Sequence, residues 1–174
     1  CVLPALLVHL AEVYGDPQVH PQRERPDYLD PAVELQIGDV RNPDSVARAL
    51  AGADAVVHCD GNHALLETIT ASSVGRVVVA SPLLDDAPPR FEGLHVRAGI
   101  VLGRNADPST LSLFAGPVAV DAGGSGDRPL QVIHPHDLQR VLVRAVLDGE
   151  SSGTVDVAAD GETSVRAVAA ALGR

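Results

Sequence analysis

The chain has 174 residues, of which 45% are hydrophobic and 21% are charged, a length that suits one domain with a buried core. Its net charge of -10 argues against a general nucleic-acid binder, because such a protein needs a basic surface. All 13 basic residues are arginines, so any mechanism that requires a lysine is excluded. No apolar run reaches the length of about 18 residues that a transmembrane helix needs, and we expect no membrane partner.

The cysteine content indicates the compartment. Cys1 and Cys59 are the two cysteines, which allow at most one disulfide and exclude a disulfide-built secreted scaffold. Residues 1–10 are apolar but lack the basic segment of a signal peptide. We therefore expect a reduced, cytoplasmic protein. A chain that begins at Cys1 rather than at methionine is also expected to be a piece of something longer.

The first half of the chain alternates predicted helices and strands. Asn42, Pro43 and Asp44 form a helix start with a capping side chain, a proline in the first position and an acid in the first turn. In chain order we predict a helix over 2–12, a strand over 33–37, a helix from 42, a strand over 54–58, a helix over 65–74 and a strand over 77–80. Uniformly apolar strands between helices are typical of a parallel sheet that is covered on both faces.

The second half contains shorter elements and one long amphipathic helix. That helix is predicted over 135–147, where apolar residues recur on one stripe and Gly149 follows the end. The other predicted elements are a strand over 95–102, a short helix from 107, strands over 118–120 and 130–133, a strand over 155–158 and a helix over 164–172. The cluster Gly123, Gly124, Ser125 and Gly126 precedes a strand rather than a helix, so we interpret it as a turn and not as a phosphate loop.

These elements predict an α/β fold with a Rossmann-like doubly wound parallel sheet and a small mixed C-terminal lobe. We expect a single domain over 1–174, with a nucleotide-binding part over about 1–94 and a C-terminal part over about 95–174. In an open sheet of this kind, ligands bind outside the carboxyl ends of the strands. Residues 38–40 and 58–61 follow two such ends, either as ligand contacts or simply as turns.

Five stretches of the sequence resemble the NAD(P)-dependent epimerase/dehydratase family, the extended short-chain dehydrogenases. They are GDVRNPDSV from residue 38, ADAVVH from 53, VRAGIVLG from 96, RPLQVIHPHDL from 128 and AADGETSVR from 158. Their order is the order of the family, and the resemblance extends from about residue 33 to the end.

The resemblance implies a site for NAD or NADP and, in an active protein, for a small-molecule substrate. It implies no catalytic residue in this chain. It implies that Asp39 and Val40 meet the adenine, that His58, Cys59, Asp60 and Gly61 line the cofactor channel, that Ala80 and Ser81 lie beside the nicotinamide, and that Ala98 and Gly99 lie near the nicotinamide end.

Two motifs of the family are absent. The chain has no GxxGxxG fingerprint, so the fold is expected to be incomplete at its N-terminus. It also has no Tyr-x-x-x-Lys pair, because Tyr14 and Tyr28 lie far upstream and no lysine exists. In the family, the lysine and the cofactor allow the tyrosine to take a hydroxyl proton during hydride transfer. We therefore predict a nucleotide-binding protein with impaired or absent oxidoreductase or epimerase catalysis.

Two other functions stay open from the sequence. One is an active short epimerase or reductase that acts on a sugar nucleotide or a similar substrate, and the other is a non-catalytic interaction module. Family members commonly pair through helices, and the apolar helix over 65–74 is a candidate for a homodimer contact. Histidines near Cys59 and at 134 and 136 have metal-ligand side chains, but nothing in the sequence brings them together, and we predict no metal. Arg97 and Arg128 have side chains that can bind an anionic substrate group, but the commoner role of an arginine, a surface ion-pair partner, is the one we expect.

Overall fold

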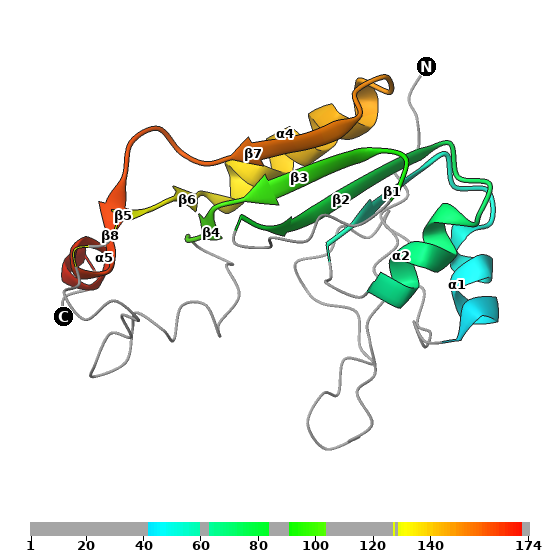
Figure 1. Cartoon of the computed structure of the whole chain (residues 1–174), viewed down its shortest axis with the longest axis horizontal. Helices are drawn as coiled ribbons and strands as arrows, with labels where there is room; N and C mark the ends of the chain where they lie inside the picture. The colour runs from blue at the N-terminus through cyan, green and yellow to red at the C-terminus, as the bar shows by residue number, and fades with distance from the viewer. Residues whose placement is uncertain (1–41, 60–62, 84–90, 104–126, 128, 172–174) are drawn as a thin grey trace. The chain divides into compact units, whose positions relative to one another are not determined.

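The computed structural model describes residues 42–59, 63–83, 91–103, 127 and 129–171. Its elements are α1 (Pro43–Leu50), β1 (Ala55–His58), α2 (His63–Thr70), β2 (Arg76–Pro82), β3 (Leu94–Ala98), β4 (Ile100–Val101), β5 (Pro129–Leu130), β6 (Val132–Ile133), α4 (Pro135–Leu147), β7 (Gly153–Val157), β8 (Thr163–Ser164) and α5 (Val165–Ala171) (Figure 1). The elements predicted over 2–12, 33–37 and 118–120 and from 107 lie outside the described residues.

Four strands form one sheet in the order β1-β2-β3-β7. Strand β3 pairs in parallel with β2, from Val78 opposite Leu94 to Pro82 opposite Ala98, and with β7 on its other side. The arrowheads of β2, β3 and β7 accordingly point the same way in Figure 1. The predicted α/β fold with a parallel, Rossmann-like sheet is confirmed.

The described residues fall into two compact units, 42–56 with 63–77 and 57–59 with 78–171. In the first unit, the Asn42 side chain accepts a hydrogen bond from the Asp44 backbone N–H at 3.0 Å, and Pro43 is the first helical residue, as predicted. Helix α1 packs against α2, and the two helices bury Val46, Ala49, Leu50, Leu65, Leu66 and Ile69. A single domain stays a prediction.

Helix α2 ends at Thr70, before the predicted end at residue 74. The Thr70 hydroxyl donates to the carbonyls of Leu66 at 3.0 Å and Glu67 at 2.9 Å. The Ser72 hydroxyl donates to the Ile69 carbonyl at 2.6 Å. The Glu67 and Ile69 carbonyls also accept from the N–H groups of Ala71 and Ser72. Side-chain hydrogen bonds of this kind to the backbone of the last turn favour a helix end here.

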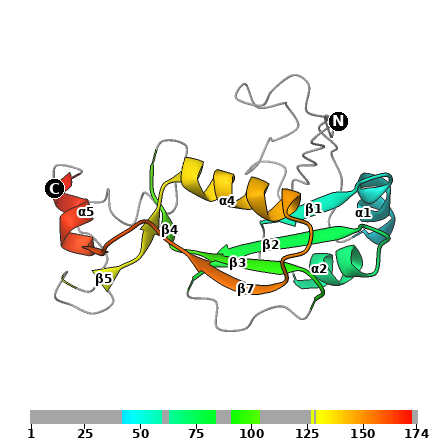
Figure 2. The same cartoon turned by 90° about the horizontal axis from the view of Figure 1, so that it is seen from above.

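In the second unit, α4 packs on one face of the sheet. Its bounds and its apolar stripe agree with the prediction, and α4 runs along strands β2 and β3 (Figure 2). The core between them consists of Val78, Leu94, Val96 and Ala145, with Leu138, Val141, Leu142 and Val146 packed against it. His134 caps the helix by accepting from the His136 N–H at 3.2 Å. Gly149 follows the helix with φ +54°, a conformation that favours glycine.

The single strand predicted over 95–102 is wrong, because β3 ends at Ala98 and β4 begins at Ile100. A Cβ atom on Gly99 would lie 2.7 Å from the Gln131 carbonyl oxygen, so the chain passes close to another backbone segment here. Strand β4 then leaves the large sheet and pairs in parallel with β6.

The strand predicted over 130–133 is likewise two strands. β6 pairs with β4, whereas β5 pairs antiparallel with β8, which leads directly into α5. Among the described residues, no helix is long and apolar enough to cross a membrane.

Candidate functional site

The carboxyl ends of the parallel strands hold several of the predicted site residues. Ala80 and Ser81 lie near the end of β2, and Ala98 ends β3. Backbone hydrogen bonds tie these ends together: the Leu83 N–H donates to the Ala98 carbonyl at 2.7 Å, and the Gly99 N–H donates to the Val157 carbonyl at 2.9 Å. Ligands of open α/β sheets bind outside this edge.

Three further predicted site residues, His58, Cys59 and Gly99, are among the described residues. His58 is buried at the end of β1, and Cys59, directly after it, is exposed. Asp39, Val40, Asp60 and Gly61 lie outside the described residues. Gly99 is beside the strand ends, but the space next to its Cα is occupied by the Gln131 backbone. The glycine at this position therefore has a structural reason that is independent of any ligand.

The two faces of the sheet differ in polarity near this edge. Val78 and Val96 face α4, as their shared core shows. Because side chains alternate along a strand, Ser81 on β2 and His95 and Arg97 on β3 lie on the opposite face. The parallel register sets Ser81 beside Arg97, so a polar row extends across the strands on this face.

Ser81 and His95 are joined within this row. The Ser81 Oγ atom lies 2.7 Å from His95 Nε2, a hydrogen bond of ordinary length. The His95 side chain is among the most buried of the described residues, at 1% exposure, and Phe91 contacts its ring edge-on with the centroids 6.4 Å apart. Ser81 is partly exposed, so the pair connects a buried imidazole to a hydroxyl nearer the surface.

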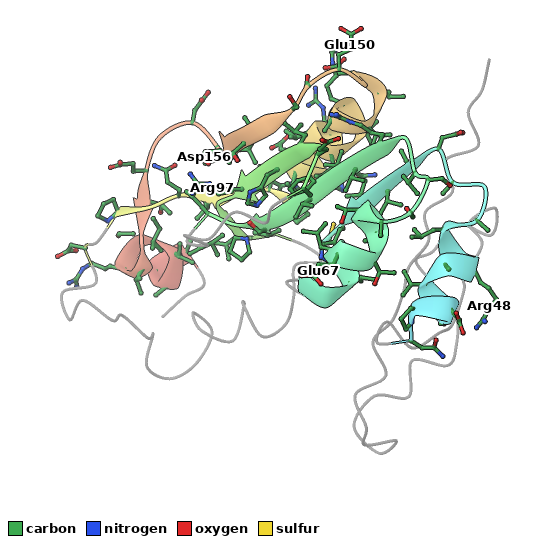
Figure 3. All side chains as sticks on the ribbon, turned by 45° about the vertical axis from the view of Figure 1, so that its right-hand side comes forward. Arg48, Glu67, Arg97, Glu150 and Asp156 are labelled. Carbon is green, nitrogen blue, oxygen red and sulfur yellow. The ribbon has the colours of Figure 1, made fainter. Side chains whose placement is uncertain are left out.

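Arg97 and Asp156 continue the row. They are register partners on β3 and β7, and the guanidinium donates to both carboxylate oxygens, at 2.7 and 2.8 Å. Figure 3 shows the two labelled side chains next to each other on these strands. Their hydrogen bond is the main cause that lowers the pKa of Asp156 below its ordinary value, and His95 adds a smaller effect in the same direction. The prediction that Arg97 is an ion-pair partner is confirmed.

Sequence reasoning missed His95. The alternation of Val96, Ala98 and Ile100 predicted a strand from residue 95 but no role for His95, which is 1% exposed. A signal was present, because a histidine directly between Leu94 and Val96 is unusual in a strand that is covered on both faces.

The other candidate chemistry is not supported by the described geometry. Among the residues that the structure describes, no group of three or more His, Cys, Asp or Glu side chains lies close enough to hold a metal ion. His134 and His136 are in edge-to-face contact, with centroids 5.2 Å apart, and His134 serves as the cap of α4. Two hollows of the described surface, of about 500 Å³ at Phe91, His95 and Gly153 and about 910 Å³ along α4, are lined by none of the predicted site residues.

Comparison with solved structures defines the class of fold: it is that of NAD-dependent sugar-nucleotide epimerases and dehydratases. A UDP-glucose 4-epimerase from Thermus thermophilus, in complex with NAD, is 16% identical with a TM-score of 0.67, over 87% of this chain and 72% of that one. A dTDP-glucose 4,6-dehydratase from Streptomyces venezuelae, with NAD bound, is 19% identical with a TM-score of 0.61, over 82% of this chain and 63% of that one. A UDP-glucose 4-epimerase from Thermotoga maritima is 12% identical with a TM-score of 0.59, over 87% and 71%. The family resemblance is thus confirmed at the level of the fold.

Curated relatives are closer in sequence but much longer. The uncharacterized protein Rv2047c of Mycobacterium tuberculosis is 37% identical over 171 residues, which cover 87% of this chain and 20% of that protein. The uncharacterized protein Mb2073c of Mycobacterium bovis matches with the same values. The chain therefore spans about one fifth of the length of the curated relatives it matches. No protein-family model matches the chain.

Proposed function

We propose that this chain is a nucleotide-binding module that takes NAD or NADP at the carboxyl edge of its sheet and does not itself catalyse hydride transfer. The observation that carries the proposal is the Ser81 hydroxyl, which His95 holds at 2.7 Å near the carboxyl end of β2. This edge is where α/β sheets of this type bind nucleotides. The solved structures of epimerase and dehydratase that share the fold contain NAD.

The described residues are compatible with such a ligand. Ala80 and Ala98 are small, so they leave room beside the strand ends, and Ser81 and the exposed Cys59 supply polar atoms. When bound, the dinucleotide would supply a hydride acceptor or donor. Ser81 would then bind and orient the nicotinamide end of the ligand, and Asp39 would accept a hydrogen bond from the adenosine.

Lack of turnover follows from the residues that the chain lacks. Enzymes of the epimerase/dehydratase family, which this chain resembles, use a tyrosine in hydride transfer, and a nearby cation helps to deprotonate that tyrosine. This sequence has no lysine, and both of its tyrosines, Tyr14 and Tyr28, precede the region that resembles the family. The proposal concerns the 174 residues, and the activity of a longer protein that contains them is a separate question.

Calorimetric titration tests the binding half of the proposal. We expect saturable binding of NAD⁺ or NADP⁺ and weaker binding to the Asp39→Ala variant. Asp160→Ala, which removes an exposed acid far along the sequence, is the matched control and should bind as the wild type does. Unchanged affinity in Asp39→Ala would count against the adenosine site, and the absence of any nucleotide binding would favour the interaction-module alternative.

A turnover assay tests the catalytic half. The pure chain should not reduce NAD⁺ or NADP⁺ with alcohols, nor interconvert UDP-sugars in the presence of NAD⁺. Clear turnover would instead support the alternative of an active short epimerase or reductase. A homodimer also stays a prediction, and the apolar residues of α2 that suggested it, Leu65, Leu66 and Ile69, are buried within the chain itself.

A further inference from the structure

We propose that His95 is a positioning residue, which fixes the Ser81 hydroxyl for hydrogen bonding to the carboxamide-bearing end of a bound dinucleotide. This inference rests on the proposed function, because it names how one end of the same ligand is recognised. It assigns a role to a side chain that neither the sequence motifs nor the strand pattern indicated.

The geometry gives the two residues different mobility. His95 is 1% exposed and is fixed by the strand on which it lies, by Phe91 against its ring and by the hydrogen bond to Ser81. A serine hydroxyl at a strand end rotates freely unless a partner selects one orientation. The contact of 2.7 Å to His95 Nε2 is such a partner, whereas the Pro82 carbonyl at 3.4 Å offers only a long, weak contact.

Hydrogen-bond chemistry explains how this selects a ligand. A hydroxyl has one donor and two acceptor positions, and the contact with Nε2 uses one of them. When Nε2 carries a proton it donates to Ser81, and the hydroxyl proton becomes available to a ligand carbonyl. When Nε2 has none, Ser81 donates to it, and its lone pairs become available to a ligand N–H group. A primary carboxamide offers both a carbonyl and N–H donors, so it can pair with Ser81 in either state.

The position of the pair restricts its effect to one part of the ligand. Ser81 is the residue that the family resemblance sets beside the nicotinamide, and the adenine contacts are predicted at Asp39 and Val40. Loss of the Ser81 contact should therefore weaken binding of NAD⁺ and of nicotinamide mononucleotide but not of AMP. A structural defect of the whole sheet would weaken all three.

A double-mutant cycle with these three probes tests the inference by calorimetry. We expect Ser81→Ala and His95→Leu each to weaken NAD⁺ binding about three- to ten-fold, the range of one ordinary hydrogen bond. The double variant should lose no more than either single variant, because His95 acts through Ser81. His95→Gln carries an amide in place of the imidazole and should retain most of the affinity. Ser73→Ala removes an exposed serine elsewhere and should bind as the wild type does.

The outcomes separate this inference from the function on which it rests. Three results would overturn the positioning role: additive losses of NAD⁺ affinity in the double variant, a His95→Gln variant that does not restore the affinity, or a weakening of AMP binding equal to that of NAD⁺ binding. Unchanged NAD⁺ affinity in Ser81→Ala would overturn it too and would leave nucleotide binding intact. If the wild-type chain binds AMP but not NAD⁺, the proposed dinucleotide site fails, and the role of His95 fails with it. Thermal unfolding of every variant should remain cooperative, and loss of this transition identifies a variant that has lost its fold. If His95→Leu has lost its fold, the affinity of His95→Gln decides in its place.

Discussion

Arg97 and Asp156 stand opposite each other on neighbouring parallel strands and are joined by two hydrogen bonds, at 2.7 and 2.8 Å. The pair links β3 to β7, which is the last strand in the sheet order and has mostly exposed side chains. A planar guanidinium matches both carboxylate oxygens, which gives this pair a defined geometry that most surface ion pairs lack. Arg97 is also the register partner of Ser81 on β2, so the pair extends the polar row on this face to β7.

The pH dependence of this pair can be predicted from the lowered pKa of Asp156. Because the pKa is lower in the folded state than the ordinary 3.8, the ionised carboxylate stabilises the fold above that pH. The contribution should be lost as the pH falls from 3.8 through the lower folded value. In urea unfolding, Asp156→Asn should therefore be less stable than the wild type at pH 7, and the difference should shrink under strongly acidic conditions. Since the pair is exposed, added salt should also reduce the stability difference between Asp156→Asn and the wild type.

Asp160→Asn is the control for that experiment, because it removes an exposed carboxylate of the same region. Its stability difference from the wild type should be small at both pH values. A difference for Asp156→Asn that grows as the pH falls would contradict the account.

Gly99→Ala tests the close approach of two backbone segments beside the strand ends. The added Cβ would lie 2.7 Å from the Gln131 carbonyl oxygen and 2.9 Å from its carbon, and neither backbone atom can move as a flexible side chain does. We expect a loss of about 1–3 kcal/mol in the free energy of unfolding, as for overpacked sites. Gly75→Ala is the matched control, since its Cβ would meet the Asp54 carbonyl oxygen at an ordinary 3.5 Å. Equal stability of the two variants would show that this contact is not tight.

Asn42→Ala tests the cap of α1. The Asn42 side chain accepts from the Asp44 N–H, and loss of such a cap typically costs about 1 kcal/mol in the free energy of unfolding. Asn42→Asp retains an accepting oxygen at the same place and should stay close to the wild type. Denaturant unfolding monitored by circular dichroism provides the measurement. If Asp and Ala at position 42 have the same effect, the helix does not depend on this hydrogen bond.

The sequence predicts well those elements whose signals are local. The cap at Asn42 and the stripe of α4 are each encoded in a short segment, and both agree with the structure. The break at Gly99 was not predictable from alternation, because its cause is the Gln131 backbone, which is distant in sequence. The split between β5 and β6 has the same origin, since each strand finds a different partner.

The candidate site shows the same division between local and distant information. Ser81 was identified by the resemblance to the epimerase/dehydratase family, which rests on short stretches of the sequence. His95 was missed because its role depends on the register that sets β3 beside β2 and on the coverage of both faces of the sheet. Hydrogen bonds between strands are therefore the part of the site that pattern analysis does not provide.

The most direct test of nucleotide binding at the carboxyl edge uses the exposed Cys59 thiol, directly after β1, as a reporter. In a Cys1→Ser background, alkylation of Cys59 by iodoacetamide is followed by mass spectrometry with and without NAD⁺. We predict that NAD⁺ slows the reaction in a saturable manner, while adenine-free sugar phosphates do not. An alkylation rate that does not change with NAD⁺, even at concentrations that saturate the calorimetric signal, would contradict a dinucleotide site at this edge.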